Sequence, residues 1–113
     1  MQFTESLKKN YQFRFVYNKG KSIANRQLVM YILENNTEFN HLGVSVSKKV
    51  GKSVVRSRVT RLIKENYRLA EQKIKCGYDI IVIARNATKD SGYAEINRSL
   101  KHLLKKHGIL KEG

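Results

Sequence analysis

A run of basic residues in the middle of the chain is the clearest candidate for a functional site. Residues 48–75 hold ten Lys and Arg residues against two Glu residues, a net +8 of the chain's formal +14. Uncompensated like charges repel one another, so such a run favours a polyanionic partner, nucleic acid first and an anionic membrane surface second. On an ordinary solvated helix face, nearby acidic residues balance the basic ones. Glu65 and Glu71 are too few to balance the ten basic residues of this run.

The same stretch carries apolar residues at helical spacing. A helix from Ser53, as its N-cap, to about Lys73 places one apolar stripe toward a sheet: Val55, Val59, Leu62, Ile63, Leu69 and Ala70. On the opposite side lie Ser57, Arg61, Lys64 and Arg68, with Arg56 and Arg58 flanking the stripe and Lys48, Lys49 and Lys52 before the helix. The spacing predicts a docked helix that presents its charges outward at one-turn intervals suited to phosphates.

Acids, histidines and the cysteine give no sign of protein-based catalysis. The nine acidic residues are scattered, whereas a metal-dependent nuclease needs clustered carboxylates. His41, His102 and His107 show no paired spacing with acids, and the last two are expected on the exposed side or end of the final helix. A single cysteine, Cys76, excludes an internal disulfide and a zinc framework. We therefore expect no catalytic residue, no bound metal and no cofactor held by the protein alone.

The remaining elements follow from periodicity. Helices are predicted over residues 7–20, ending at Gly20, and from Asp90 or Ser91 to Gly108, where Ile96, Leu100, Leu103 and Leu104 share one face. Strands are predicted over 26–33, 41–47 and 78–85, with a short extra one over 21–25 and the first two long ones paired antiparallel. The pattern predicts one domain over 1–113, an α/β (α+β) sandwich with helices packed on a mixed four-stranded sheet.

Neither export nor membrane insertion is expected. The longest apolar runs, residues 28–33 and 80–84, fall far short of the ~20 residues that a membrane span needs. The first nine residues, MQFTESLKK, contain no apolar segment of a signal peptide. A cytoplasmic protein is predicted.

Residues 45–65, SVSKKVGKSVVRSRVTRLIKE, closely resemble the protein subunit of bacterial ribonuclease P, whose pattern SKKxGxAVxRNRxKRxIRE lies on a basic helix. The resemblance continues upstream in residues 7–33, similar to LKKxxxFxxVxxxGxSxxNxxxVxYxL, and downstream in GYDIIVIAR at 77–85. Three positions depart from the family pattern: Ser57 stands for the central Asn, Thr60 for a Lys, and Lys52 for a usual Asn. A hydroxyl such as that of Ser57 cannot span two partners as an amide can.

The resemblance implies a fold similar to the second domain of ribosomal protein S5, with a left-handed βαβ crossover through the basic helix. It implies a role beside a catalytic RNA that, with Mg²⁺, hydrolyses one phosphodiester of precursor tRNA and releases the 5′ leader. One protein per RNA is expected. The RNA subunit would be bound by Lys48, Lys49, Lys52, Arg56, Ser57, Arg58, Arg61, Lys64 and Arg68.

The resemblance also implies a cleft between the first helix and the sheet that holds the single-stranded leader. The candidate residues are Phe13, Tyr17, Tyr31, Lys19 and Arg26. Aromatic rings can stack on unpaired bases of any sequence, while nearby cations hold the phosphates. Spacing alone favours Phe13 and Tyr17 as core residues of an amphipathic helix, whereas the resemblance favours binding for Tyr17 and Tyr31.

Other classes of function remain possible from the residues alone. A ribosomal protein or general RNA chaperone of similar fold would also carry a basic helix, but it would not need a groove for a mobile single strand. A DNA-binding helix is poorly supported, because few Asn or Gln residues fall on the basic face to read base edges. A membrane-surface helix is weaker still, since the apolar side of this helix is needed for the core.

Overall fold

Five strands form one mixed sheet in a computed structural model that describes residues 1–111. The strands are β1 (Thr4–Ser6), β2 (Lys21–Ala24), β3 (Leu28–Glu34), β4 (Asn40–Ser45) and β5 (Tyr78–Ala84). Their order across the sheet is β1-β4-β5-β3-β2. β5 pairs parallel with β4 on one side and antiparallel with β3 on the other, and the short edge strands β1 and β2 complete the sheet.

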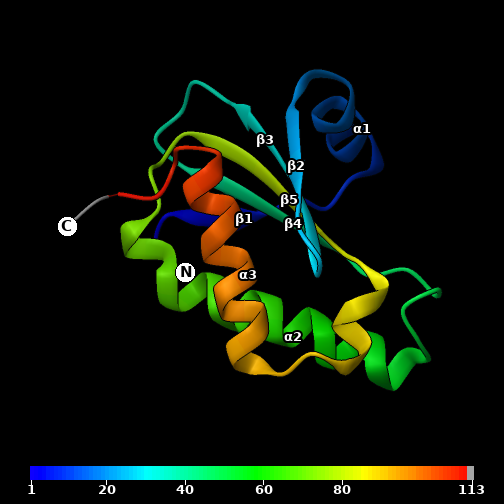
Figure 1. Cartoon of the computed structure of the whole chain (residues 1–113). Helices are drawn as coiled ribbons and strands as arrows, with labels where there is room; N and C mark the ends of the chain where they lie inside the picture. The colour runs from blue at the N-terminus through cyan, green and yellow to red at the C-terminus, as the bar shows by residue number, and fades with distance from the viewer. Residues whose placement is uncertain (112–113) are drawn as a thin grey trace.

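Three helices cover the two faces of this sheet (Figure 1). The helices are α1 (Asn10–Lys19), α2 (Ser53–Ala70) and α3 (Tyr93–Lys106), with short 3-10 turns η1 (Glu71–Lys73) and η2 (Asn86–Asp90). α1 packs on one face, whereas α2 and α3 cross the other. No helix among residues 1–111 is long and apolar enough to cross a membrane.

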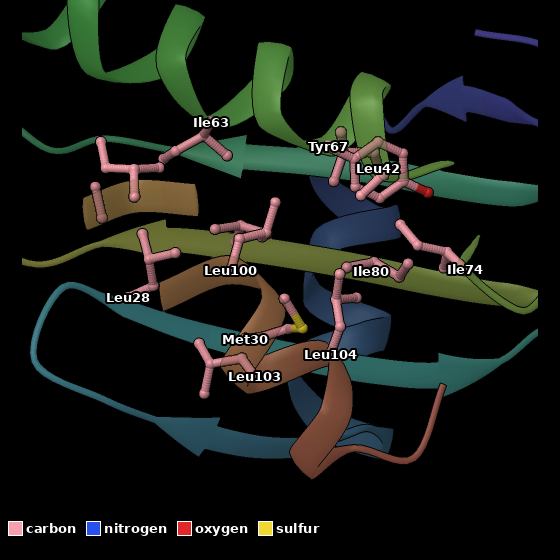
Figure 2. Packing of buried hydrophobic residues seen from close by; sticks show 14 of the residues in the cluster. Leu28, Met30, Leu42, Ile63, Tyr67, Ile74, Ile80, Leu100, Leu103 and Leu104 are labelled. Carbon is pink, nitrogen blue, oxygen red and sulfur yellow. The ribbon is translucent and has the colours of Figure 1, made fainter. Parts of the chain in front are cut away.

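The core has two parts because β5 is covered on both faces. Ile80 and Val82 point toward α2 and α3 and join the larger cluster, in which Ile63, Tyr67 and Leu100 are fully buried (Figure 2). Ile81 points the other way and packs with Val16 of α1 and Leu7 in a smaller cluster. Burial on both faces explains why this strand reads as an unbroken apolar run rather than an alternating one.

The prediction of four strands is wrong by one strand, β1. Its three residues, Thr4–Ser6, contain no apolar alternation that could reveal them as a strand. Tertiary contacts hold them in place: the Glu71 carboxylate accepts hydrogen bonds from the backbone N–H groups of Gln2 (2.8 Å) and Phe3 (3.2 Å). The Thr4 and Tyr67 hydroxyls also lie 2.9 Å apart. The predicted short strand at 21–25 is confirmed as β2.

The predicted antiparallel pairing of the first two long strands is also wrong. β3 and β4 do not touch as neighbours, because β5 lies between them. Short connections usually join adjacent strands, which made a hairpin the natural expectation. The most apolar strand instead takes the centre of the sheet, where both of its faces are covered. The chain therefore runs from β4 through α2 to β5 as a parallel crossover. The left-handed sense of that crossover stays a prediction.

Two helices begin one or two residues from the predicted caps. Lys52 occupies the N-cap position of α2, and Ser53 is its first helical residue. Gly92, rather than Asp90 or Ser91, caps α3, and its N–H donates to the Glu95 carboxylate at 3.2 Å. The predicted apolar face of α3 is confirmed. On α2, Leu69 is 59% exposed, whereas Asn66 and Tyr67 are buried in the core-facing stripe.

Candidate RNA interface

A basic groove lies between α2 and β4. Its volume is about 670 Å³, and it is lined by Val44, Val46, Ser53, Arg56, Ser57, Thr60, Arg61, Lys64, Glu65 and Arg68, together with Met1. The side chains of Ser57, Arg61, Lys64 and Arg68 are exposed, as the helical spacing predicts. The apolar residues of α2 dock the helix on the sheet, so the cations stand at one-turn intervals on a rigid support.

Arg56 has a polar atom that the protein does not satisfy. Its Nε is buried and has no hydrogen-bond partner among the described residues. A buried N–H without an acceptor is costly, and charged donors gain most when they meet an anionic oxygen. Arg56 lines the basic groove, although this Nε is itself shielded from solvent.

The flanking position of Arg58 predicts a side chain that points into solvent, but the Arg58 guanidinium contacts the protein instead. Its guanidinium donates to the backbone carbonyls of Lys89 at 2.7 Å and Ser91 at 3.0 Å, with Thr88 at 3.5 Å. These carbonyls belong to η2 and the residue after it, so Arg58 ties α2 to the segment that precedes α3. The donors of Arg58 are thus largely occupied within the protein.

Most cations of α2 have no acidic neighbour. Arg68 pairs with Glu65 at 2.9 Å, an exposed i, i+3 pair of the kind worth little stability. Within residues 1–111 it is the only Lys or Arg residue in an ion pair. Lys48, Lys49 and Lys52 are exposed just before the helix. The positive charge of this surface is therefore available to a ligand.

An aromatic groove lies on the opposite face of the sheet, beside α1. Its volume is about 500 Å³, and it is lined by Asn10, Phe13, Arg14, Tyr17, Val44 and Ser45. Phe13 is half-buried and lies against Gly43, where an added Cβ would come within 2.7 Å of the Phe13 ring. The glycine thus lets the ring form the floor of the groove.

The three predicted aromatic residues come together. The Tyr17 ring centroid lies 6.3 Å from that of Phe13 and 5.0 Å from that of Tyr31, the latter pair edge to face. Tyr17 is 37% exposed, whereas Tyr31 is half-buried behind it and does not line the groove. Burial, and then the neighbouring Tyr31, raise the pKa of Tyr17, so its hydroxyl stays neutral at physiological pH.

The two predicted basic partners of these aromatics lie elsewhere. Lys19 lines a hollow of about 340 Å³ with Lys21 and His107, and Arg26 stands on the turn between β2 and β3, next to α3. Arg14 is the cation that lines the aromatic groove. The sequence contained a signal for it, because Asn10, Arg14 and Tyr17 share one side of the helix at i, i+4, i+7.

The basic and aromatic grooves meet at the edge of β4. Val44 lines both of them. β1 pairs with β4 only as far as Leu42, so the remainder of that edge is not covered by a strand. A ligand in one groove can therefore continue into the other around this edge.

One histidine departs from the sequence prediction, and another is less exposed than its place at a helix end suggests. His41 is paired with an acid after all: its Nδ1 lies 2.8 Å from Asp79 Oδ1, which also accepts a hydrogen bond from Asn35 Nδ2 at 2.9 Å. His107 lies at the end of α3 as predicted, as its C-cap residue, but it is half-buried: its Nε2 lies 2.9 Å from the Met30 carbonyl, and burial lowers its pKa. Neither histidine lines either of the two grooves. Residues 1–111 contain no group of three or more His, Cys, Asp or Glu side chains placed to hold a metal ion.

Comparisons with known proteins agree with one another. The family model described as Ribonuclease P matches residues 1–108. The chain is 58% identical over 110 residues to the ribonuclease P protein component of Alkaliphilus metalliredigens, covering 97% of this chain and 99% of that protein. It is 57% identical over 104 residues to the same component of Clostridium botulinum, covering 91% and 94%.

Solved structures show the same likeness. The ribonuclease P protein of Staphylococcus aureus superimposes with a TM-score of 0.87 at 42% identity, covering 94% of this chain and 97% of that one. The ribonuclease P protein of Thermotoga maritima gives a TM-score of 0.83 at 28% identity, covering 96% and 99%.

Proposed function

The chain belongs to the bacterial ribonuclease P protein family and is the protein subunit of a ribonuclease P ribonucleoprotein; from this premise we propose which surface binds which RNA. The basic groove along α2 holds the RNA subunit, and the aromatic groove beside α1 holds the single-stranded 5′ leader of precursor tRNA. Because the chain belongs to this family, the alternative functions of a ribosomal protein and of a general RNA chaperone are no longer needed to explain its basic helix.

One observation carries the proposal: two grooves of different chemistry adjoin at Val44. The α2 groove is lined by cations and hydroxyls, which suits the phosphates of a folded RNA. The α1 groove combines Tyr17 and Phe13 with Arg14, which suits unpaired bases and their backbone without regard to sequence. Their junction would let one protein contact the RNA subunit and a leader that emerges beside it.

The RNA subunit and the protein contribute differently to the reaction. The RNA subunit, with Mg²⁺, carries out phosphodiester hydrolysis, and the protein contributes binding energy and positive charge. A net charge of +14 offsets part of the repulsion between packed phosphates, so the protein lowers the Mg²⁺ concentration that the reaction requires. Residues 1–113 act as one RNA-binding unit, one copy per RNA, in the cytoplasm.

Within the α2 groove, Arg61, Lys64 and Arg68 are the exposed phosphate ligands, and the half-buried Arg56 adds positive charge to the wall of the groove. Lys48, Lys49 and Lys52 extend the site beyond the start of the helix. Ser57 and Thr60, which depart from the family pattern, still line the groove and can each form a hydroxyl hydrogen bond. Arg58 contributes indirectly, by fixing η2 against α2.

The test is a salt titration of RNA-subunit binding by an α2 variant, Arg61→Ala/Lys64→Ala. Both side chains are exposed, so the fold should persist while the slope of log affinity against log salt falls by about two units, one for each lost phosphate contact. The matched control is Lys73→Ala/Lys75→Ala, which removes the same charge from exposed positions outside the groove. Equal slopes for the wild type and both variants would show that α2 is not the RNA-binding surface.

A further inference from the structure

We propose that α3 carries a second RNA-binding site, separate from the α2 and α1 grooves, which takes the phosphate backbone of a double-helical segment of the RNA subunit. We call it the α3 surface and define it by Arg26, Arg98, Lys101, His102 and Lys105. The proposal rests on the proposed function, since it assumes that the protein binds the RNA subunit. None of these five residues lines either of the other two grooves.

The outer side of α3 is a second row of uncompensated cations. Arg98, Lys101 and Lys105 are all exposed, at i, i+3 and i+7 on the side opposite the buried residues Ile96 and Leu100. Helical geometry places them about one turn apart, ~5 Å along the axis, as on α2. Glu95 is the acid on this side of the helix, and its carboxylate accepts the Gly92 N–H at 3.2 Å as part of the cap.

The turn between β2 and β3 adds Arg26 to this row. Arg26 and Arg98 line one hollow of about 290 Å³ with His102 and with Glu95, the acid that caps α3. Arg26 is thus grouped with the cations of α3 and not with the aromatics of the α1 groove. The β2–β3 turn and α3 build this surface from two distant parts of the chain.

Asn25 holds this arrangement in place. Its Nδ2 donates to the Ser99 carbonyl at 3.0 Å and lies 3.2 Å from His102 Nδ1, while its Oδ1 accepts the Ser99 hydroxyl at 2.7 Å. A guanidinium N–H of Arg85 donates to the Asn25 carbonyl at 2.7 Å. Because Asn25 Nδ2 is a donor, His102 Nδ1 is an acceptor, and the ring proton is on Nε2, available to a phosphate oxygen. The cations therefore stand on a fixed scaffold rather than on a loose turn.

The composition of the α3 surface selects the form of nucleic acid. Apart from the imidazole of His102, no aromatic ring lines its hollow, in contrast to the Tyr17 and Phe13 rings of the α1 groove. Single strands are held largely by stacking, whereas double-stranded RNA is recognised by its shape and phosphates. The α3 surface has the cations for the second mode and lacks the rings for the first.

The test compares Arg98→Ala/Lys101→Ala with the control Lys73→Ala/Lys75→Ala in a salt titration of RNA-subunit binding. We expect the α3 variant to lower the salt slope by about two units, since each lost phosphate contact on a duplex contributes about 0.9. We expect the control to change the slope by less than half of that amount. Equal effects of the α3 variant and the control would overturn the second site.

A positional readout completes the test. In a Cys76→Ser background, a photo-crosslinker attached at Lys101→Cys should mark base-paired nucleotides of the RNA subunit, whereas the same group at Lys73→Cys should mark few. Crosslinks from position 101 to the leader or to unpaired nucleotides alone would overturn the duplex assignment.

The Arg61→Ala/Lys64→Ala variant, measured alongside, separates the proposed function from the second site. If it loses slope and the α3 variant does not, the second site fails and the proposed function stands. If neither loses slope, the proposed function fails as well.

Discussion

Arg58 and Arg61 lie one turn apart on α2, but their guanidinium groups have different surroundings. The Arg58 guanidinium donates to carbonyls of η2 and Ser91, whereas Arg61 is exposed and lines the basic groove. On the helix Arg58 flanks the apolar stripe and Arg61 lies opposite it, so both are predicted to point into solvent. The packing of η2 against α2 brings the Arg58 guanidinium into contact with backbone carbonyls, and no local pattern encodes that contact.

The first prediction follows from this difference. Arg58→Ala should lower the free energy of unfolding by about 1–3 kcal/mol, because it removes charge-assisted hydrogen bonds to partly buried carbonyls. Arg61→Ala should leave it within about 0.5 kcal/mol, as expected for an exposed side chain. Urea unfolding of both variants measures the two values. Similar stabilities for the two variants would contradict the structural role of Arg58.

A second prediction concerns Glu71, which holds the first residues against the end of α2. Burial raises its pKa, but hydrogen bonds from Thr4 and from the backbone N–H groups of Gln2 and Phe3 outweigh burial and leave the pKa below its ordinary value of 4.5. A lowered folded-state pKa contributes stability above the unfolded-state pKa and loses it as pH falls through the folded-state value. Glu71→Gln should therefore be less stable than wild type at neutral pH.

The difference between the two proteins should shrink as the pH falls below the ordinary value of 4.5, because the unfolded-state carboxylate then binds its proton before the folded-state one does. Thermal or urea unfolding at a series of pH values measures it. A difference that stays constant down to pH 3 would mean that the carboxylate charge is not what stabilises this contact.

At the scale of elements, α1 and β4 form the aromatic groove through one close approach. An added Cβ at Gly43 would lie 2.7 Å from the Phe13 ring and 3.3 Å from a Leu7 methyl group. Gly43→Ala should push the Phe13 ring out of its place, with a stability loss of about 1–3 kcal/mol typical of overpacking. It should weaken binding of precursor tRNA with a leader more than binding of mature tRNA. A crystal structure of the variant with Phe13 unmoved would contradict this account.

Sequence patterns predicted those elements whose signal is local. The amphipathic spacing of Ile96, Leu100, Leu103 and Leu104 placed α3 correctly, and the basic and apolar stripes of α2 fixed which side faces the sheet. Strand order was missed, because β5 joins the sheet between β3 and β4 through contacts that no hairpin signal records. β1 was missed for a similar reason, since it pairs with β4 and its Thr4 contacts the Tyr67 hydroxyl, both far along the chain.

The candidate sites were predicted to a similar extent. Phe13, Tyr17 and Tyr31 are brought together as expected, although Tyr31 supports Tyr17 from behind rather than lining the groove. Arg26 and Lys19 are far enough along the chain from Arg14 to reach other surfaces, and their positions depend on the path of β2 and on α3. Helical spacing shows which side of α1 carries Arg14, but the residues that lie beside Lys19 and Arg26 depend on the fold.

At the scale of the whole molecule, charge and aromatic groups are divided between surfaces. Cations line α2 and the outer side of α3, while α1 carries exposed rings; the rings of Phe39 and of Tyr93, at the start of α3, are also exposed. α1 itself has two aromatic flanks: Tyr17 in the groove, and Tyr11 and Phe15 on the other side, exposed by 61% and 57%. Exposure alone therefore does not identify the leader site, and position beside the groove does. This layout supplies an internal control for the central claim.

The central claim is that Tyr17 contacts the leader, and it is tested most directly by the affinity of the reconstituted holoenzyme for two tRNAs. Tyr17→Ala should weaken binding of a precursor with a leader of several nucleotides by roughly 1–2 kcal/mol, the contribution of one stacked base. It should leave mature tRNA unaffected, and Phe15→Ala should change neither affinity. Equal losses for precursor and mature tRNA, or an equal loss from Phe15→Ala, would contradict the assignment of this groove to the leader.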